Sequence, residues 1–121
     1  MTLDVRLDGS VRVFEFHGAL DFGPPLALLE SSFERTLDEG ARQMLFDLTD
    51  VSHIDSSGLG LVIKCHQRAR QDRGVVKLVL TDRSKQLFEI TRLETMFEIH
   101  ATVALALASF AAPDGGYRET F

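Results

Sequence analysis

The pattern that most constrains the fold is an alternation of short apolar runs with amphipathic helical stretches. Residues 44–48 and 75–80 have the composition of buried strands, and each is followed by apolar residues at helical spacing. Before them, residues 3–7 and 11–16 alternate with period two around Asp8-Gly9-Ser10, which is typical of a hairpin. Strands that alternate with helices after an initial hairpin predict an α/β fold with a mixed sheet.

We expect a single domain in which four to five strands, including the N-terminal hairpin, are flanked by about four helices. A loop is expected over residues 18–25, and Gly40 should stop the first helix. In the third helix we expect Leu87, Phe88 and Ile90 to be buried. A proline and two glycines follow the last apolar stretch, so the domain should span residues 1–112 and residues 113–121 should form a flexible tail. The expected helices cover residues 25–39, 57–73, 83–91 and 101–111, and a last short strand covers 96–99.

Charge and composition exclude several classes of protein. With 121 residues, of which 45% are hydrophobic, the chain can bury a core without disulfides, and its one cysteine, Cys65, cannot form one internally. The 13 basic and 18 acidic side chains give a net charge of −5, which disfavours nucleic acid and anionic membranes as partners. The first residues alternate and carry charge, unlike a signal peptide, so we expect a cytoplasmic protein.

The run Ile54-Asp55-Ser56-Ser57-Gly58-Leu59-Gly60 carries most of the functional information, because it joins a predicted strand to a predicted helix. Helix starts have unpaired N–H groups and a positive dipole, which suit a hydroxyl cap and suit an attached phosphate still better. The simpler interpretation is that Ser56 or Ser57 only caps the helix. Two glycines near a helix start cost about 1 kcal/mol each, which suggests that another surface approaches closely there. Asp55 could cap the helix or order the loop.

We therefore expect Ser56 to be a reversible phosphorylation switch. A phosphate would add roughly −1.5 to −2 charges without unfolding the domain, because a helix N-terminus favours negative charge. It would act instead on whatever protein binds at that place, since an unpaired dianion is costly to bury in an interface.

Residues 51–60, Val-Ser-His-Ile-Asp-Ser-Ser-Gly-Leu-Gly, closely resemble the signature of the STAS-domain anti-sigma factor antagonists. The resemblance extends over about residues 3–110 and includes the segments 18–21 and 87–91. It implies a bacterial regulator that binds an anti-sigma factor when unphosphorylated. That partner is a histidine-kinase-like ATPase that acts as a serine kinase, and phosphorylation of Ser56 releases it. A metal-dependent serine phosphatase then resets the cycle.

The resemblance also implies roles for neighbouring residues. Asp21 matches the loop aspartate near the phosphorylated serine, so we expect it to contact the partner together with Asp55 and residues 57–60, namely Ser57, Gly58, Leu59 and Gly60. The kinase supplies ATP and magnesium, so no cofactor or metal is expected in this chain. Three departures stand out: Phe22-Gly23-Pro24-Pro25 replaces polar and small residues, His53 replaces a bulky apolar residue, and Arg92 takes a place that is often glycine.

Two other functions stay open. The chain could be a STAS accessory subunit of a membrane transport system, which would bind its partner without phosphorylation. A small serine hydrolase using Ser56 is the weaker alternative, because Ile54 stands where the nucleophile elbow needs its first glycine. The four histidines show no metal-ligand spacing along the chain, so we expect no metal site. Because the nucleophile elbow is missing, we expect a binding protein and not an enzyme.

Overall fold

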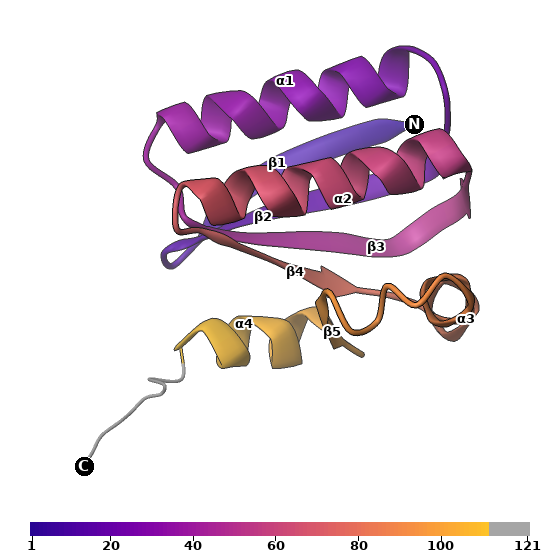
Figure 1. Cartoon of the computed structure of the whole chain (residues 1–121). Helices are drawn as coiled ribbons and strands as arrows, with labels where there is room; N and C mark the ends of the chain where they lie inside the picture. Colours follow the sequence, from indigo (N-terminus) through magenta and orange to yellow (C-terminus); the bar gives the residue numbers. More distant parts are fainter. Residues whose placement is uncertain (112–121) are drawn as a thin grey trace.

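The computed structural model describes residues 1–111, and in them five strands form one sheet in the order β1-β2-β3-β4-β5 (Figure 1). Strands β1 (Thr2–Asp8) and β2 (Val11–Leu20) form the antiparallel hairpin. Strands β3 (Gln43–Ile54), β4 (Val75–Val79) and β5 (Glu98–His100) each lie parallel to the preceding strand. The predicted α/β fold with a mixed sheet is confirmed.

Helices connect the parallel strands. From β2 onward, each strand lies next to its predecessor and the sheet grows in one direction, so right-handed crossovers place the connecting helices on one face. Figure 1 shows two of them, α1 and α2, side by side on that face, while α4 lies across the opposite face. The helices are α1 (Pro24–Asp38), α2 (Ser56–Gln71), α3 (Asp82–Ile90) and α4 (Val103–Ala111).

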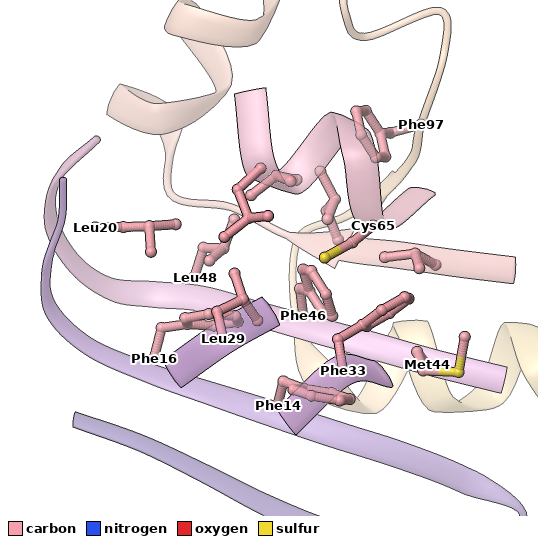
Figure 2. Close-up of a cluster of buried hydrophobic side chains, with 14 of the residues drawn as sticks. Phe14, Phe16, Leu20, Leu29, Phe33, Met44, Phe46, Leu48, Cys65 and Phe97 are labelled. Carbon is pink, nitrogen blue, oxygen red and sulfur yellow. The ribbon is translucent and has the colours of Figure 1, made fainter. Parts of the chain in front are cut away.

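The main core lies between the sheet and helices α1 and α2 (Figure 2). Phe14 and Phe16 point from β2 into this layer, and their ring centroids lie 5.1 and 5.3 Å from that of Phe46 on β3. Phe33 of α1 packs edge-on against the Phe46 ring at 5.9 Å. Such offset aromatic contacts add to the free energy of apolar burial, so this cluster holds α1 against the central strands.

A smaller core forms under α4 on the other face of the sheet. It consists of buried Val11, Val13, Leu45, Val79 and Ala106, with Val103, Leu107 and Phe110 packed against it. The alternation along β2 explains both layers, since successive side chains of a strand point to opposite faces.

Lys77 of β4 also helps to hold α4 in place. Its ammonium, on a residue only 8% exposed, lies 2.8 Å from Glu98 and 2.7 Å from the Ser109 hydroxyl. It also lies 4.3 Å from the centre of the Phe110 ring.

Several expectations differ from the structure. The last strand covers Glu98–His100 and not residues 96–99, and Leu87 is half-buried rather than buried. Residues 18–20 are strand rather than loop, because Gly18, Ala19 and Leu20 pair with the last residues of β3. For the same reason β3 continues well past residue 48, to Ile54. Ile90 is 80% exposed, since it lies two residues and about 200° around α3 from buried Phe88. The expected tail over residues 113–121 lies outside the described part of the chain.

Candidate functional site

The segment around Ser56 lies where β2 and β3 end together. Leu20 and Ile54 are the last paired residues of these two parallel strands, and α2 begins two residues later at Ser56. The Ser56 residue is exposed, and Ser57 is half-buried. The strand ends therefore present a hydroxyl to solvent at the first turn of a helix.

Asp55 joins this helix start to the loop that precedes α1. One oxygen, Oδ1, accepts the Gly58 N–H at 2.8 Å, and the other, Oδ2, accepts the Phe22 N–H at 3.0 Å. The hydrogen bonds from Gly58 and Phe22 lower the pKa of the Asp55 carboxyl, so it is ionised at neutral pH. Asp55 thus does both things that the sequence left open: it caps α2 and it orders the neighbouring loop.

The N-cap of α2 is Asp55 and not a serine, so the interpretation in which Ser56 or Ser57 only caps the helix is wrong. Ser56 is instead the first residue inside the helix. Capping does not account for its hydroxyl, which leaves a chemical role open for it.

The two glycines of the motif have different surroundings. A Cβ at Gly58 would come within 2.1 Å of the Leu20 carbonyl oxygen, so this glycine lets the start of α2 pass close to β2. The close approach that the sequence suggested is therefore internal at Gly58, which is buried. Gly60 is exposed and faces open space.

The other predicted site residues lie around this contact. Asp21 is half-buried and stands between Leu20, which touches Gly58, and Phe22, which binds Asp55. Leu59 is half-buried and packs against the main core. The structure thus brings the loop containing Asp21 next to the 55–60 segment.

Two neighbouring features were missed as site elements from the sequence. Phe22 is 81% exposed although its backbone is hydrogen-bonded to Asp55. A shallow groove also runs from the end of β3 to the start of α3, with Ser52, His53, Arg83 and Leu87 among its lining residues. The unusual residues Phe22 and His53 were the signals in the sequence that could have pointed to these two features. The groove itself could not be predicted, because its two sides are distant in the sequence.

The hairpin brings together a group that spacing along the chain did not reveal. Ligand atoms of Asp4, Glu15 and His17 all lie within 4.8 Å of one another on the surface. The His17 imidazole also lies 2.7 Å from the Asp50 carboxylate, and this hydrogen bond raises the pKa of His17. In residues 1–111 the hydrogen-bonded His–carboxylate pairs are His17–Asp50 and His100–Glu98, so none belongs to the Ser56 segment.

No helix among the described residues has both the length and the apolar character needed to cross a membrane.

Comparison with known proteins gives consistent results. The sequence model of the STAS domain family matches residues 2–106 of this chain. A stretch of 54 residues is 44% identical to the anti-sigma-B factor antagonist of Listeria monocytogenes, covering 44% of this chain and 47% of that protein. For the anti-sigma-B factor antagonist of Staphylococcus aureus, identity is 33% over 73 residues, or 60% of this chain and 68% of the relative. The chain thus spans about half the length of the Listeria relative.

Solved structures share the fold. The Bacillus cell fate determinant SpoIIAA in its phosphorylated form aligns with a TM-score of 0.72 and 19% identity, over 90% of this chain and 99% of that one. A sulfate transporter family protein from Wolinella succinogenes aligns with a TM-score of 0.69 and 19% identity, over 86% and 87% of the two chains. At this level of identity, the likeness concerns the fold alone.

Proposed function

Because the chain belongs to the STAS domain family, we propose that it is an anti-sigma factor antagonist whose binding is switched by phosphorylation of Ser56. When unmodified, it binds an anti-sigma factor of the histidine-kinase-like ATPase class. That partner transfers phosphate to Ser56 and dissociates, and a metal-dependent serine phosphatase reverses the change. The chain itself acts by binding, without catalysis and without a cofactor, in the cytoplasm.

One observation carries this proposal: an exposed serine occupies the first position of α2, next to a different residue that already caps the helix. A kinase can reach such a hydroxyl, and its modification leaves the Asp55–Gly58 capping bond in place. The positive end of the helix dipole also favours the added charge. Phosphorylation therefore changes the surface of the domain and not its fold.

Electrostatics explain how the phosphate would release the partner. The Asp55 carboxylate beside Ser56 is already charged, and its two oxygens already accept N–H groups from Gly58 and Phe22. A phosphate would take the net charge from −5 to about −6.5 or −7 and place a second anionic group beside the first. Burying it unpaired costs several kcal/mol, and about 4 kcal/mol already weakens binding about 10³-fold.

The contact surface in this proposal consists of the residues around the switch. Ser57, Leu59 and Gly60 follow Ser56 in the first turns of α2. Asp21 lies in the loop that Asp55 ties to this helix start through the Phe22 N–H. Gly58 contributes indirectly, because its missing side chain allows the two segments to meet.

The first experiment identifies the partner and the modified residue together. The Ser56→Ala form, which cannot be phosphorylated at this position, should capture a histidine-kinase-like ATPase from the source cell. That ATPase, purified and given ATP with magnesium, should label the wild-type chain on Ser56, as mapped by mass spectrometry.

Ser57→Ala is the matched control, since it removes the neighbouring hydroxyl and should still be labelled on Ser56. Normal labelling of Ser56→Ala, with phosphate on another residue, would contradict the assignment. Full affinity of the Ser56-phosphorylated protein for the ATPase would contradict the switch.

The fold does not separate this function from that of a transport accessory subunit, because a sulfate transporter family protein shares it. The sequence relatives favour the antagonist, since those described above are named anti-sigma-B factor antagonists. Capture of a transporter subunit in place of the ATPase, with no phosphate at Ser56, would support the alternative.

A further inference from the structure

Phe22 is the most exposed large hydrophobic side chain in the described residues, at 81%. It follows the end of β2 by two residues and begins the short connection to α1. Single exposed apolar residues are common on protein surfaces, so exposure alone assigns nothing to Phe22. Its attachment and its position carry the argument.

The connection that presents Phe22 is held at both ends. The Phe22 N–H donates to Asp55 Oδ2 at 3.0 Å, and Gly23 adopts φ 130°, a conformation that side chains with a Cβ rarely take. Pro24 and Pro25 then restrict φ at the start of α1, while the Leu26 N–H bonds the Gly23 carbonyl at 3.1 Å. The backbone under the ring is therefore ordered before any partner binds, which lowers the entropy cost of binding through it.

Position links this ring to the switch. Asp55 binds the Phe22 backbone through one carboxylate oxygen and directly precedes Ser56 in the chain, so the Phe22 backbone lies next to the residue before the switch. A protein that covers the Ser56 hydroxyl therefore approaches the loop that carries the exposed Phe22 ring. Aromatic side chains at the centre of an interface commonly provide much of its binding energy.

We propose that Phe22 is an aromatic anchor that inserts into an apolar pocket of the anti-sigma kinase and determines which kinase this chain recognises. The inference rests on the proposed function, since it concerns the partner of the same site. It also gives a role to the departure at positions 22–25, where a large apolar residue on a rigid support replaces polar and small residues.

The test measures affinity for the purified histidine-kinase-like ATPase captured by Ser56→Ala, by isothermal titration calorimetry with ADP present and ATP absent. Truncating an anchor typically weakens an interface by 10-fold or more, so Phe22→Ala should raise Kd about 30-fold. Phe22→Leu keeps an apolar side chain and should lose less affinity than Phe22→Ala. Melting temperatures of all variants should match the wild type, because the ring is exposed.

Leu7→Ala is the matched control for removing an exposed apolar side chain. Leu7 is 62% exposed and pairs with Arg12 near the start of β2, at the opposite end of that strand from Phe22. The Kd of Leu7→Ala for the ATPase should stay within twofold of the wild-type value.

The outcomes separate the two proposals. Wild-type affinity of Phe22→Ala, together with loss of binding on phosphorylation of Ser56, would overturn the anchor and leave the switch standing. An equal loss for Leu7→Ala and Phe22→Ala would overturn the anchor too. If the wild-type chain binds no such ATPase, both proposals fail.

Discussion

Asp55 shows how much one side chain can organise. Its two carboxylate oxygens bond two segments that are far apart in the sequence, the start of α2 and the loop after β2. The sequence identified Asp55 as a candidate for both tasks. It could not tell which residue caps the helix, because Asp55, Ser56 and Ser57 are all good capping types at neighbouring positions. Only the extended backbone of Asp55 and the helical backbone of Ser56 decide this.

At the same scale, His17 should make stability depend on pH. The hydrogen bond to Asp50 raises the pKa of His17 above its ordinary value of 6.5 in the folded state. Desolvation opposes this rise, and attraction to the charges of Asp50, Asp4 and Glu15 adds to it. A raised pKa stabilises the fold fully below the unfolded value, near pH 6.5, and this contribution is lost as pH rises through the folded pKa. The excess stability of the wild type over His17→Gln should therefore be larger at pH 5.5 than at pH 8.5.

Urea unfolding at a series of pH values measures this difference. Asp50→Asn, which removes the main partner and keeps the imidazole, should remove most of the same pH dependence. A gap between wild type and His17→Gln that is constant across the range would contradict the prediction.

At the scale of elements, the first three helices end in the same way. After α1, α2 and α3 the chain turns through a residue with left-handed backbone angles. The N–H of the residue that follows then donates to the carbonyl of the third-last residue of the helix: Ala41 to Thr36, Gly74 to Ala69 and Leu93 to Phe88. The left-handed residue is Gly40 after α1, but Arg73 and Arg92 after the other two, with φ of 63° and 61°. The sequence predicted that the second helix covers residues 57–73, yet α2 ends at Gln71 and the left-handed residue is Arg73.

These two arginines offer a test of the helix ends. Replacing Arg73 or Arg92 by glycine should stabilise the protein by about 1 kcal/mol, because a left-handed conformation is strained for a residue with a Cβ. Arg70→Gly is the matched control: the same substitution inside the last turn of α2 should destabilise by about 1 kcal/mol. Chemical denaturation of the three variants measures the sign, and destabilisation by Arg92→Gly would refute the explanation.

The paired glycines of α2 make a second test at this scale. Gly58→Ala should destabilise by about 3 kcal/mol, because the new methyl would collide with the Leu20 carbonyl oxygen. Gly60→Ala should stabilise by about 0.5–1 kcal/mol, because it meets no other atom and alanine favours helix. Thermal unfolding measures the stability of the two variants. Equal changes in stability for Gly58→Ala and Gly60→Ala would show that a small shift relieves the contact with Leu20.

For the whole molecule, the sequence predicted the architecture well because strand and helix periodicities are strong and lie in a simple order. It underestimated β3, because most of its residues after Leu48 are polar and exposed and are held in the sheet by pairing with β2. It also missed the groups that form only when strands come together, such as His17 with Asp50. Both the length of β3 and the His17–Asp50 contact depend on pairing between segments that are distant in the sequence. Local composition does not reveal such pairing.

At this scale the proposed switch predicts an unchanged fold. The chain phosphorylated on Ser56 should keep the far-ultraviolet circular dichroism spectrum of the unmodified form and a melting temperature within a few degrees of it. The physical reason is that the modified hydroxyl is exposed and the capping bond belongs to Asp55. Amide chemical-shift changes should be confined to residues 20–23 and 54–60. Widespread changes over β4 and α4 would show a conformational mechanism instead.

The order of the strands also bears on self-association. The sheet leaves β1 and β5 as its outer strands. Strand β5 has three residues, and β1 carries the charged side chains of Asp4, Arg6 and Asp8 along its length. Short or charged borders are poor templates for a foreign strand. Growth of one sheet onto another through these two outer strands is therefore disfavoured.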